Sequence, residues 1–538
     1  MHAATEALNT VPPLPKASRW RALGRELPLW AGMVLGLGAL WWRGHAFVLD
    51  RDLRGYHWPE YLVQAWRIRE GTFDTDAGFR KSLYPAVLQA IGEVVGYADA
   101  AVILGSIGAA LCVVSAGLLA RSLADAPTGG LAALGVGLVP LVAQSSHWAT
   151  SYPVSAGTIG LGLAASAAFA RWPSGRTALL PGLCTGLALA VDDRGALVVP
   201  MAAMGVVLGV VRGRGAAWLA VPVLVLSPLL PAGLEQLLGY VPELFGGVGG
   251  RLDAQRAVAS RWAQISGRPG LQLPCADTPV HAWMRPSFFP SACGQAVLMD
   301  NRAWALPRAL GVPLAWVWVG LLGWWVPWPK RERWVSAAAV LGAIVGPVVL
   351  FAALTPLPAR YLVQLVVPLG VVLPVGLARV CARLPRPVWW TVAVAMAVGL
   401  TQASPDAVGT LGLGDIGEWS PDAWVGDHDA LRAQLQDGDV VLDCSDHGAA
   451  VALLPHHVVP GSNLLEADVG LCQGWAQGTV AVPSGAWILT DPTRGLGVAG
   501  THNRVVVHAL VNDGVWEARV RRRGFVAWRA RSPPVSAP

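Results

Sequence analysis

Eleven apolar stretches run along this chain of 538 residues, and arginine and lysine gather in every second gap between them. A bilayer core of about 30 Å needs about 20 apolar residues in a helix, and runs such as 101–120 and 335–354 meet that length. Helices are predicted because lipid satisfies no backbone hydrogen bonds and the alternation of a barrel strand is absent. With 54% hydrophobic and 14% charged residues, the chain has too few charges to cover the surface of a soluble globular protein of this size. The sequence therefore predicts an α-helical polytopic membrane protein.

The basic residues predict which loops lie in the cytoplasm. Lys16, Arg19, Arg21 and Arg25 directly precede the first apolar run. That run ends without a small-residue cleavage site, so we expect a retained first helix instead of a signal peptide. Every loop that then falls on the cytoplasmic side is basic, which predicts an inside N-terminus and an outside C-terminus. The predicted spans are 28–47, 99–120, 130–144, 149–170, 177–191, 195–211, 216–233, 305–327, 334–353, 361–380 and 387–403.

This topology divides the chain into three predicted parts. Residues 1–27 form a cytoplasmic N-terminal segment, and residues 28–403 form a transmembrane domain with large outer loops at 48–98 and 234–304. Residues 404–538 form a soluble domain on the outer face, where the composition turns polar.

The outer domain is predicted to be a small α/β or α+β unit. Runs at 439–444, 486–490 and 504–510 read as strands, and a helix ending near Gln436 precedes the first of them. Asn512-Asp513-Gly514 predicts a hairpin turn after the third run.

Four of the seven cysteines form two pairs in segments assigned to the outside, Cys275 with Cys293 and Cys444 with Cys472. The other three, Cys112, Cys184 and Cys381, fall in or beside helices. Disulfides persist in an oxidising periplasm or extracellular space, so the pairs support the topology. Four free buried thiols are the alternative, since no zinc-type spacing of cysteines occurs.

Two carboxylates, Asp50 and Asp52, stand where the first span leaves the membrane on its outer side. They could bind a divalent cation, or one of them could act as general base on an acceptor hydroxyl or amine. The alternative is a solvated helix end or the N-cap of a helix over 59–69. Farther along the same loop, Arg80 and Lys81 could hold a phosphate, or could meet anionic lipid.

The fifth span has only about 15 apolar residues, or about 22 Å of helix, which is shorter than the bilayer core. Its outer turn, Asp192-Asp193-Arg194, is therefore predicted to lie recessed in a polar cavity, with a plain interfacial turn as the alternative. A last outer arginine, Arg360, precedes Tyr361 at the head of a span, where an anionic partner would offset the helix dipole. That partner could be a lipid phosphate.

Together these motifs resemble the GT-C superfamily, integral-membrane glycosyltransferases that take a sugar from a polyprenyl-phosphate carrier, as protein O-mannosyltransferases and lipid A aminoarabinose transferases do. The likeness covers about 400 residues loosely. In chain order it consists of Asp50 and Asp52, a Tyr61-x-x-x-Ala65 helix and Gly71, Arg80 and Lys81 with Tyr84 and Pro85, Asp193 and Arg194, Arg360 and Tyr361 before Pro368, and an outer C-terminal domain. In two respects the chain departs from the family: Arg51 separates the two acids, and His57 stands where an Asp-Glu pair is common.

The resemblance implies an inverting transfer at the outer face of the membrane. The excess of arginine over lysine and the expected periplasm favour a bacterial inner membrane. Asp50 or Asp52 would be the base, and Arg80, Lys81, Arg194 and Arg360 would stabilise the departing polyprenyl phosphate. The implied substrate-binding residues are His57, Arg80, Lys81, Tyr84, Asp192, Asp193, Arg194, Arg360 and Tyr361. The superfamily leaves metal dependence open, and Asp50 and Asp52 are the candidate ligands if a divalent cation takes part.

Two other classes of function fit a chain of this kind. A transporter or flippase of lipid-linked sugars would share the number of helices, but it would carry ionisable residues near the middle of the bilayer. A non-catalytic membrane assembly protein would present its outer domain to a partner. Nucleic-acid binding is not predicted, because the net charge of +6 is spread over many short loops and not gathered in a patch.

Overall fold

The computed structural model of the protein describes residues 16–50, 83–146, 150–213, 215–231 and 363–381, together with positions 61, 64, 65, 68, 69, 342 and 346. Toward the C-terminus it describes 429–436, 439–444, 458–460, 486–490, 510–512, 516–522 and 525–530.

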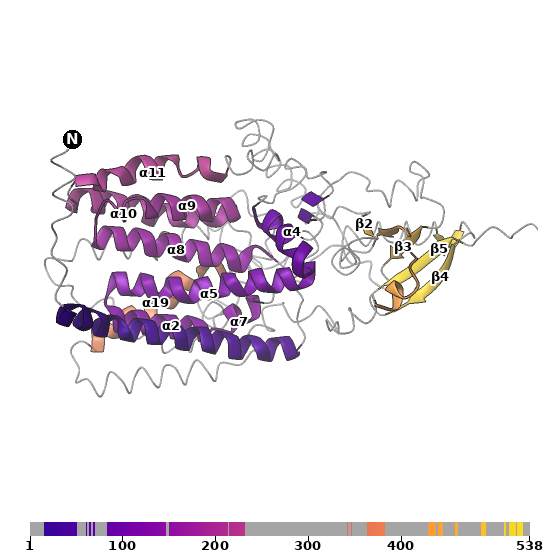
Figure 1. Ribbon diagram of the computed structural model, residues 1–538, viewed down its shortest axis with the longest axis horizontal. Helices are drawn as coiled ribbons and strands as arrows, with labels where there is room; N and C mark the ends of the chain where they lie inside the picture. The colour runs from indigo at the N-terminus through magenta and orange to yellow at the C-terminus, as the bar shows by residue number, and fades with distance from the viewer. Residues whose placement is uncertain are drawn as a thin grey trace, which may run out of the picture.

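Several apolar helices form one bundle (Figure 1). At the predicted spans lie α2 (Lys16–Asp50), α5 (Tyr97–Leu123), α6 (Ala126–Leu138), α7 (Pro140–Ser145), α8 (Tyr152–Arg171), α9 (Leu180–Val191), α10 (Val199–Arg212), α11 (Ala220–Leu226) and α19 (Val366–Cys381). Among the described residues, three segments are long and apolar enough to cross a membrane by length and composition: Asp99–Leu123, Tyr152–Arg171 and Arg194–Arg212. The protein is thus a polytopic membrane protein, as predicted. The total of eleven spans stays a prediction, because 305–327, 387–403 and most of 334–353 lie outside the described residues.

Prolines explain where the helices differ from the predicted spans. The span predicted at 130–144 is two helices, because Val139 takes an extended conformation before Pro140. The span predicted at 195–211 begins as a 3-10 helix, η1 (Asp193–Val198), and α10 follows with a proline in its first turn. The first helix differs for no such reason. It runs from Lys16 to Asp50, whereas the predicted span is 28–47.

Basic side chains tie the helices together at one end of the bundle. The Nε atom of Arg121, in the last turn of α5, lies 2.6 Å from Oε2 of Glu26 in α2. Arg171, in the last turn of α8, donates to carbonyl groups at the end of α5, where a helix lacks partners of its own. Arg212 at the end of α10 donates to a carbonyl in the last turn of α8. Loops that the charge pattern assigns to the cytoplasm therefore meet at this one end.

The first helix packs on α6 with almost no space between the two backbones. A Cβ atom added at Gly32 would stand 2.2 Å from the Cα of Gly130, and one added at Gly36 would stand 2.5 Å from the Ala133 carbonyl oxygen. Such close approach of small residues is a common way for membrane helices to pack. Because the contacting residue numbers rise together, α2 and α6 run in the same direction. Asp50 therefore ends α2 at the end of the bundle opposite to the arginines.

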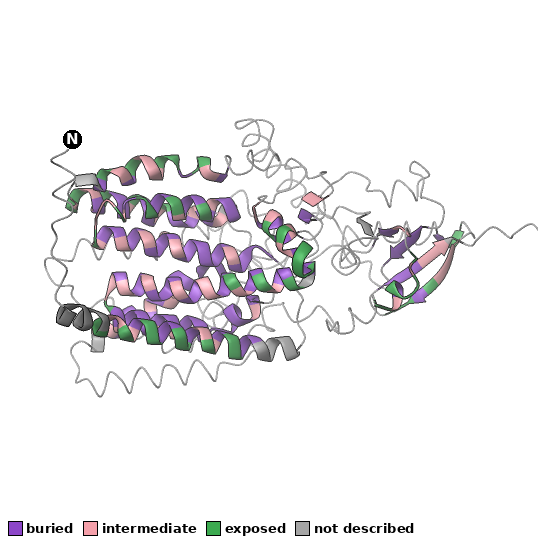
Figure 2. Cartoon of the chain, in the orientation of Figure 1, coloured by how far each residue is buried: buried purple, intermediate pink, exposed green. Residues whose placement is uncertain are grey.

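Large apolar side chains cover the outward faces of the bundle. Exposed residues lie along the outer helices α2, α10 and α11, while the faces turned inward are buried (Figure 2). On α2 the exposed apolar residues include Trp30, Val34, Leu35, Trp41 and Trp42. An apolar surface of this extent is unfavourable in water and suits contact with lipid chains.

A five-stranded sheet lies near the C-terminus, with β1 (Val441–Asp443), β2 (Val458–Pro460), β3 (Trp487–Thr490), β4 (Trp516–Arg521) and β5 (Val526–Ala530) in the order β2-β1-β3-β5-β4. β2, β1 and β3 are parallel, and β5 and β4 join them antiparallel. Apolar residues are buried on both faces, around Leu431 on one and Leu510 on the other. In Figure 1 the sheet lies beyond the end of the bundle at which α4 (Leu83–Val95) is seen.

Two strands and a helix were predicted at these places, but the hairpin was predicted wrongly. β1 and β3 fall within 439–444 and 486–490, and residues 429–432 are helical. Residues 510–512 are helical too, so no strand ends at Leu510 and no hairpin turn begins at Asn512. The hairpin comes one element later, between β4 and β5. Leu510 is buried against the sheet, and this tertiary contact outweighs the strand pattern of 504–510.

The described cysteines agree with the predicted grouping in part. Cys112 and Cys184 are free cysteines inside the bundle. Cys444 follows β1 and is buried, but its predicted partner Cys472 lies outside the described residues, as do Cys275 and Cys293. Both disulfides therefore stay predictions.

Candidate functional site

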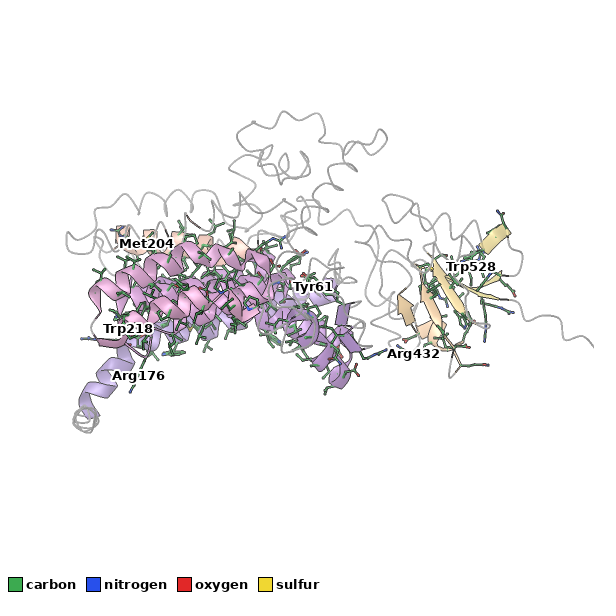
Figure 3. The ribbon with its side chains drawn as sticks, turned by 90° about the horizontal axis from the view of Figure 1, so that it is seen from above. Tyr61, Arg176, Met204, Trp218, Arg432 and Trp528 are labelled. Atoms are coloured by element: carbon green, nitrogen blue, oxygen red, sulfur yellow. The ribbon has the colours of Figure 1, made fainter. Side chains whose placement is uncertain are left out.

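A buried chain of hydrogen bonds links three distant parts of the sequence at the end of the bundle where α2 ends. The Tyr61 hydroxyl lies 2.6 Å from the Ser151 hydroxyl, just before α8 begins. The Ser151 hydroxyl donates to Oδ2 of Asp192 at 3.3 Å. Since Ser151 has a single proton and gives it to Asp192, the Tyr61 hydroxyl donates to Ser151. Figure 3 labels Tyr61 at this end of the bundle.

Asp192 holds the turn between α9 and η1. After α9 ends at Val191, Asp192 adopts an extended conformation and its Oδ1 accepts the backbone N–H of Arg194 at 2.9 Å. A side chain of this kind is the usual cap for a helix start, because the first N–H groups have no partner inside the helix. The same carboxylate lies 3.3 Å from Nη1 of Arg194. Asp192 thus stabilises the short polar turn that joins the two helices.

The ion pair between Asp192 and Arg194 is largely shielded from solvent. The side chains are 9% and 16% exposed, respectively. The Arg194 guanidinium also lies over the ring of Tyr152 in α8, 5.6 Å from its centroid. With donors from Ser151 and twice from Arg194, the Asp192 carboxylate is well occupied. Asp192 is therefore suited to hold Arg194 in place, and less suited to accept a proton from a substrate.

Tyr84 joins the same site from α4. Its ring meets the ring of Tyr61 edge-on, with centroids 5.0 Å apart. The side chain is 3% exposed, and burial raises the pKa of its hydroxyl well above the ordinary value. Tyr84 lies in the loop predicted outside the membrane, and its hydroxyl stays protonated over the physiological pH range.

A second buried link lies one turn deeper along α8. Gln364, two residues before α19, donates from Nε2 to the Ser155 hydroxyl at 3.2 Å and is fully buried. Ser155 is four residues after Ser151, so both lie on the same face of α8. Through this link the segment that follows Arg360 and Tyr361 is attached near the Asp192 site.

The structure brings together some of the residues that the sequence singled out. Tyr84, Asp192 and Arg194 are within the cluster around Tyr61 and Ser151. Asp50 is the last residue of α2, at this end of the bundle, and Asp193 is the first residue of η1; nothing is described of either side chain. The other candidates lie outside the described residues: Asp52, His57, Arg80, Lys81, Arg360 and Tyr361.

Sequence reasoning did not single out Ser151 or Gln364, and it named Tyr61 as part of a motif without placing it in the site. Ser151 stands before Tyr152-Pro153, and a serine before a proline-led helix reads as a cap. Its actual role is a bridge between Tyr61 and Asp192, which no local pattern signals. Of the two adjacent acids, Asp192 is the one seen to pair with Arg194, while nothing is described of the Asp193 side chain.

Within the described part of the chain, no three acidic, histidine or cysteine side chains gather in a way that could hold a metal ion. The candidate ligands Asp50 and Asp52 are not among the side chains described. Carboxylates are the ligands that Mg²⁺ and Ca²⁺ prefer, so the pair fits such an ion chemically.

Comparison with known proteins identifies the fold. No family model matches the chain, and no curated protein matches it. Among solved structures, ArnT from Cupriavidus metallidurans bound to undecaprenyl phosphate is 16% identical over 97% of this chain and 100% of its own, with a TM-score of 0.53. The Archaeoglobus fulgidus oligosaccharyltransferase in complex with Zn and sulfate is 13% identical over 86% of this chain and 68% of its own, with a TM-score of 0.49. The likeness to ArnT, over nearly all of both chains, establishes that this chain shares the fold of that protein.

Proposed function

We propose that the protein is a membrane glycosyltransferase that moves a sugar from a polyprenyl-phosphate carrier to an acceptor. The observation that carries the proposal is the buried cluster of Tyr61, Ser151, Asp192 and Arg194, on the fold of a protein that binds undecaprenyl phosphate. The cluster lies at the end of the bundle where α2 ends at Asp50. A carboxylate and a held arginine at one end of a membrane bundle supply the two charges that such a transfer needs.

In the proposed reaction, the acceptor oxygen or nitrogen attacks the anomeric carbon of the sugar while the bond to the carrier phosphate breaks. The acceptor proton passes to the carboxylate of Asp50 or Asp52, and the bonding electrons leave with the phosphate. Attack opposite to the leaving phosphate inverts the anomeric carbon. Cations stabilise the charge that accumulates on the phosphate, and this role is assigned to Arg80, Lys81, Arg194 and Arg360. His57, Tyr84, Asp192, Asp193 and Tyr361 complete the substrate site.

The charges described in the bundle support a transferase over a transporter. Within the described residues, the buried charged side chains are Arg43 and Asp192. Arg43 donates to the carbonyl of Leu138 at the end of α6, so it too lies toward the end of the bundle that carries the cluster. A transporter would carry ionisable residues near the middle of the bilayer. The buried charged residues among those described instead lie toward one end of the bundle.

The proposal is tested by turnover of a lipid-linked sugar. The purified protein, reconstituted in vesicles, would be given undecaprenyl phosphate that carries a radiolabelled sugar, together with a cell-envelope extract as acceptor. We expect release of undecaprenyl phosphate and transfer of label to the extract, both measured by thin-layer chromatography. Movement of the intact donor across the vesicle membrane without release would instead identify a flippase. If neither release nor movement of the donor is seen with any of several sugars, the transferase is refuted and the non-catalytic assembly function remains.

The outer location of the site and of the C-terminal domain is part of the proposal. Arg432 is exposed beside the sheet, and Arg176 is exposed at the opposite, arginine-rich end of the bundle (Figure 3). We expect a cysteine at position 432 to react with a membrane-impermeant maleimide in intact spheroplasts. A cysteine at position 176 should react only after the cells are permeabilised. The opposite pattern would place the catalytic acids in the cytoplasm and overturn the proposal.

A further inference from the structure

Three buried side chains around Tyr61 carry polar atoms that no described group satisfies. They are Oε1 of Gln64, the hydroxyl of Tyr84 and the hydroxyl of Thr150. The three residues are 8%, 3% and 2% exposed, respectively. The large majority of buried side-chain polar atoms in proteins have a hydrogen-bond partner, because an unpaired one loses its water without compensation. Three such atoms, on residues that lie near one tyrosine, indicate that something else supplies their partners.

Contacts through Tyr61 bring the three residues together from separate parts of the sequence. Gln64 lies one helical turn after Tyr61, and the Tyr84 ring meets the Tyr61 ring edge-on at 5.0 Å. Thr150 precedes Ser151, whose hydroxyl lies 2.6 Å from that of Tyr61. The three residues therefore lie near one tyrosine, at the end of the bundle where Figure 3 labels it.

The chemistry of these atoms points to a ligand that both donates and accepts hydrogen bonds. Hydroxyl groups do both, and so does the amide of a glutamine, whichever way it is turned. None of the three side chains is charged. A phosphate is bound chiefly by cations and its ionised oxygens only accept, so it would leave lone pairs on all three residues without a donor. The hydroxyl groups of a sugar match all three side chains.

We propose that Gln64, Tyr84 and Thr150 form the subsite that holds the hydroxyl groups of the transferred sugar, apart from the arginine that faces the phosphate. This inference rests on the proposed function, and it assigns the two ends of the donor to neighbouring groups of residues. The Asp192–Arg194 pair is linked to Tyr61 through Ser151. Tyr84 packs against the ring of Tyr61 itself.

The test uses substitutions that remove one polar atom and keep the shape, Tyr84→Phe and Thr150→Val. Binding to the purified full-length protein would be measured for undecaprenyl phosphate alone and for undecaprenyl phosphate that carries mannose, glucose or arabinose. For the best-bound glycosylated carrier, we expect each substitution to weaken binding roughly three- to tenfold, the effect of one neutral hydrogen bond. Binding of the unglycosylated carrier should not change. Without ligand, the variants should melt at the same temperature as the wild type or above it, because an unsatisfied polar atom has been removed.

The matched control is Tyr97→Phe. Tyr97 belongs to the same apolar cluster and is 4% exposed, but its hydroxyl already donates to Glu93 at 2.8 Å. We expect this variant to melt at a lower temperature than the wild type and to bind the glycosylated carrier normally. The control is therefore expected to lose thermal stability and keep its binding of the glycosylated carrier, whereas the two test variants should keep their stability and lose binding.

Three outcomes would overturn the inference while the proposed function stands. The first is a lower melting temperature with unchanged binding of the glycosylated carrier, which would show a structural role. The second is equal weakening for both carriers, which would show a phosphate site. In the third, neither property changes, because ordered water satisfies these atoms. If the wild-type protein binds neither carrier, the proposed function itself fails and this inference falls with it.

Discussion

Replacing Asp50 or Asp52 with asparagine should lower the release of undecaprenyl phosphate from a glycosylated donor by about a thousandfold, within the range of roughly 10²–10⁴ that a general base contributes. An amide is nearly the same size as a carboxylate but accepts no proton at neutral pH. The loss is therefore expected in kcat, with donor binding little changed. The variant with the larger loss identifies the base among the two acids that the sequence leaves open.

The control for this pair is Asp429→Asn. Asp429 is exposed at the start of the helical turn beside the sheet, where it pairs with Arg432. Exposed pairs of this kind contribute little, so the substitution should leave both stability and turnover unchanged. Full activity in both the Asp50 and the Asp52 variant would show that the base lies elsewhere. Loss in only one, with restored activity on added Mg²⁺ or Mn²⁺, would instead indicate a metal ligand.

Replacing Asp192 with alanine should lower both the stability and the turnover of the protein. It removes the cap of η1, the acceptor for Ser151 and the partner of Arg194 in a single step. Breaking a shielded ion pair of this kind costs roughly 3 kcal/mol, because the remaining arginine stays buried without its partner. The folded fraction should turn over on the order of a hundredfold more slowly, the effect of a misplaced substrate-positioning group. Asp192→Asn keeps the cap without the charge and should fall between the alanine variant and the wild type.

Asp125→Ala separates the two effects. Asp125 caps α6 at the arginine-rich end of the bundle, where its Oδ1 accepts the backbone N–H of Thr128 at 2.9 Å. Loss of that cap should cost about 1 kcal/mol and leave the turnover of the folded fraction unchanged. Thermal unfolding in detergent and turnover in vesicles, measured on both alanine variants, compare one aspartate cap at each end of the same bundle. Equal losses of turnover would show that Asp192 acts only through stability.

The charge pattern predicted the arrangement of the helices well, because it depends on residues that are read one loop at a time. Arg121, Arg171 and Arg212 were assigned to one side of the membrane from separate loops, and hydrogen bonds join their helices at one end. The helix ends themselves were less predictable. A proline marks where a helix can break, but packing decides whether it does. The helix α2 continues through Pro28, whereas the helix before Pro140 ends and a new one begins there.

The candidate site was predictable only in its charged residues. Asp192 and Arg194 stood out because charge is rare next to an apolar span, and the structure pairs them. Ser151 and Thr150 carry no such signal, since single hydroxyl residues are common near membrane helix ends. Their role depends on Tyr61, which is 90 positions from Ser151 along the sequence. A contact at that separation follows from how α8 packs against its neighbours, and a single sequence does not encode it in any local pattern.

The glycine contacts of α2 set where its last residue can be. At Gly32 and Gly36 the helix touches α6 with no space for a side chain, so it can neither slide nor turn there without a clash. Asp50 lies about 21 Å farther along the same axis, at 1.5 Å per residue. A shift of α2 by a single residue would move residue 50 by about 1.5 Å along the helix axis and rotate it by about 100° around that axis. The depth of residue 50 along the bundle is thus set by glycine contacts in the middle of the helix, well away from the end that carries the cluster.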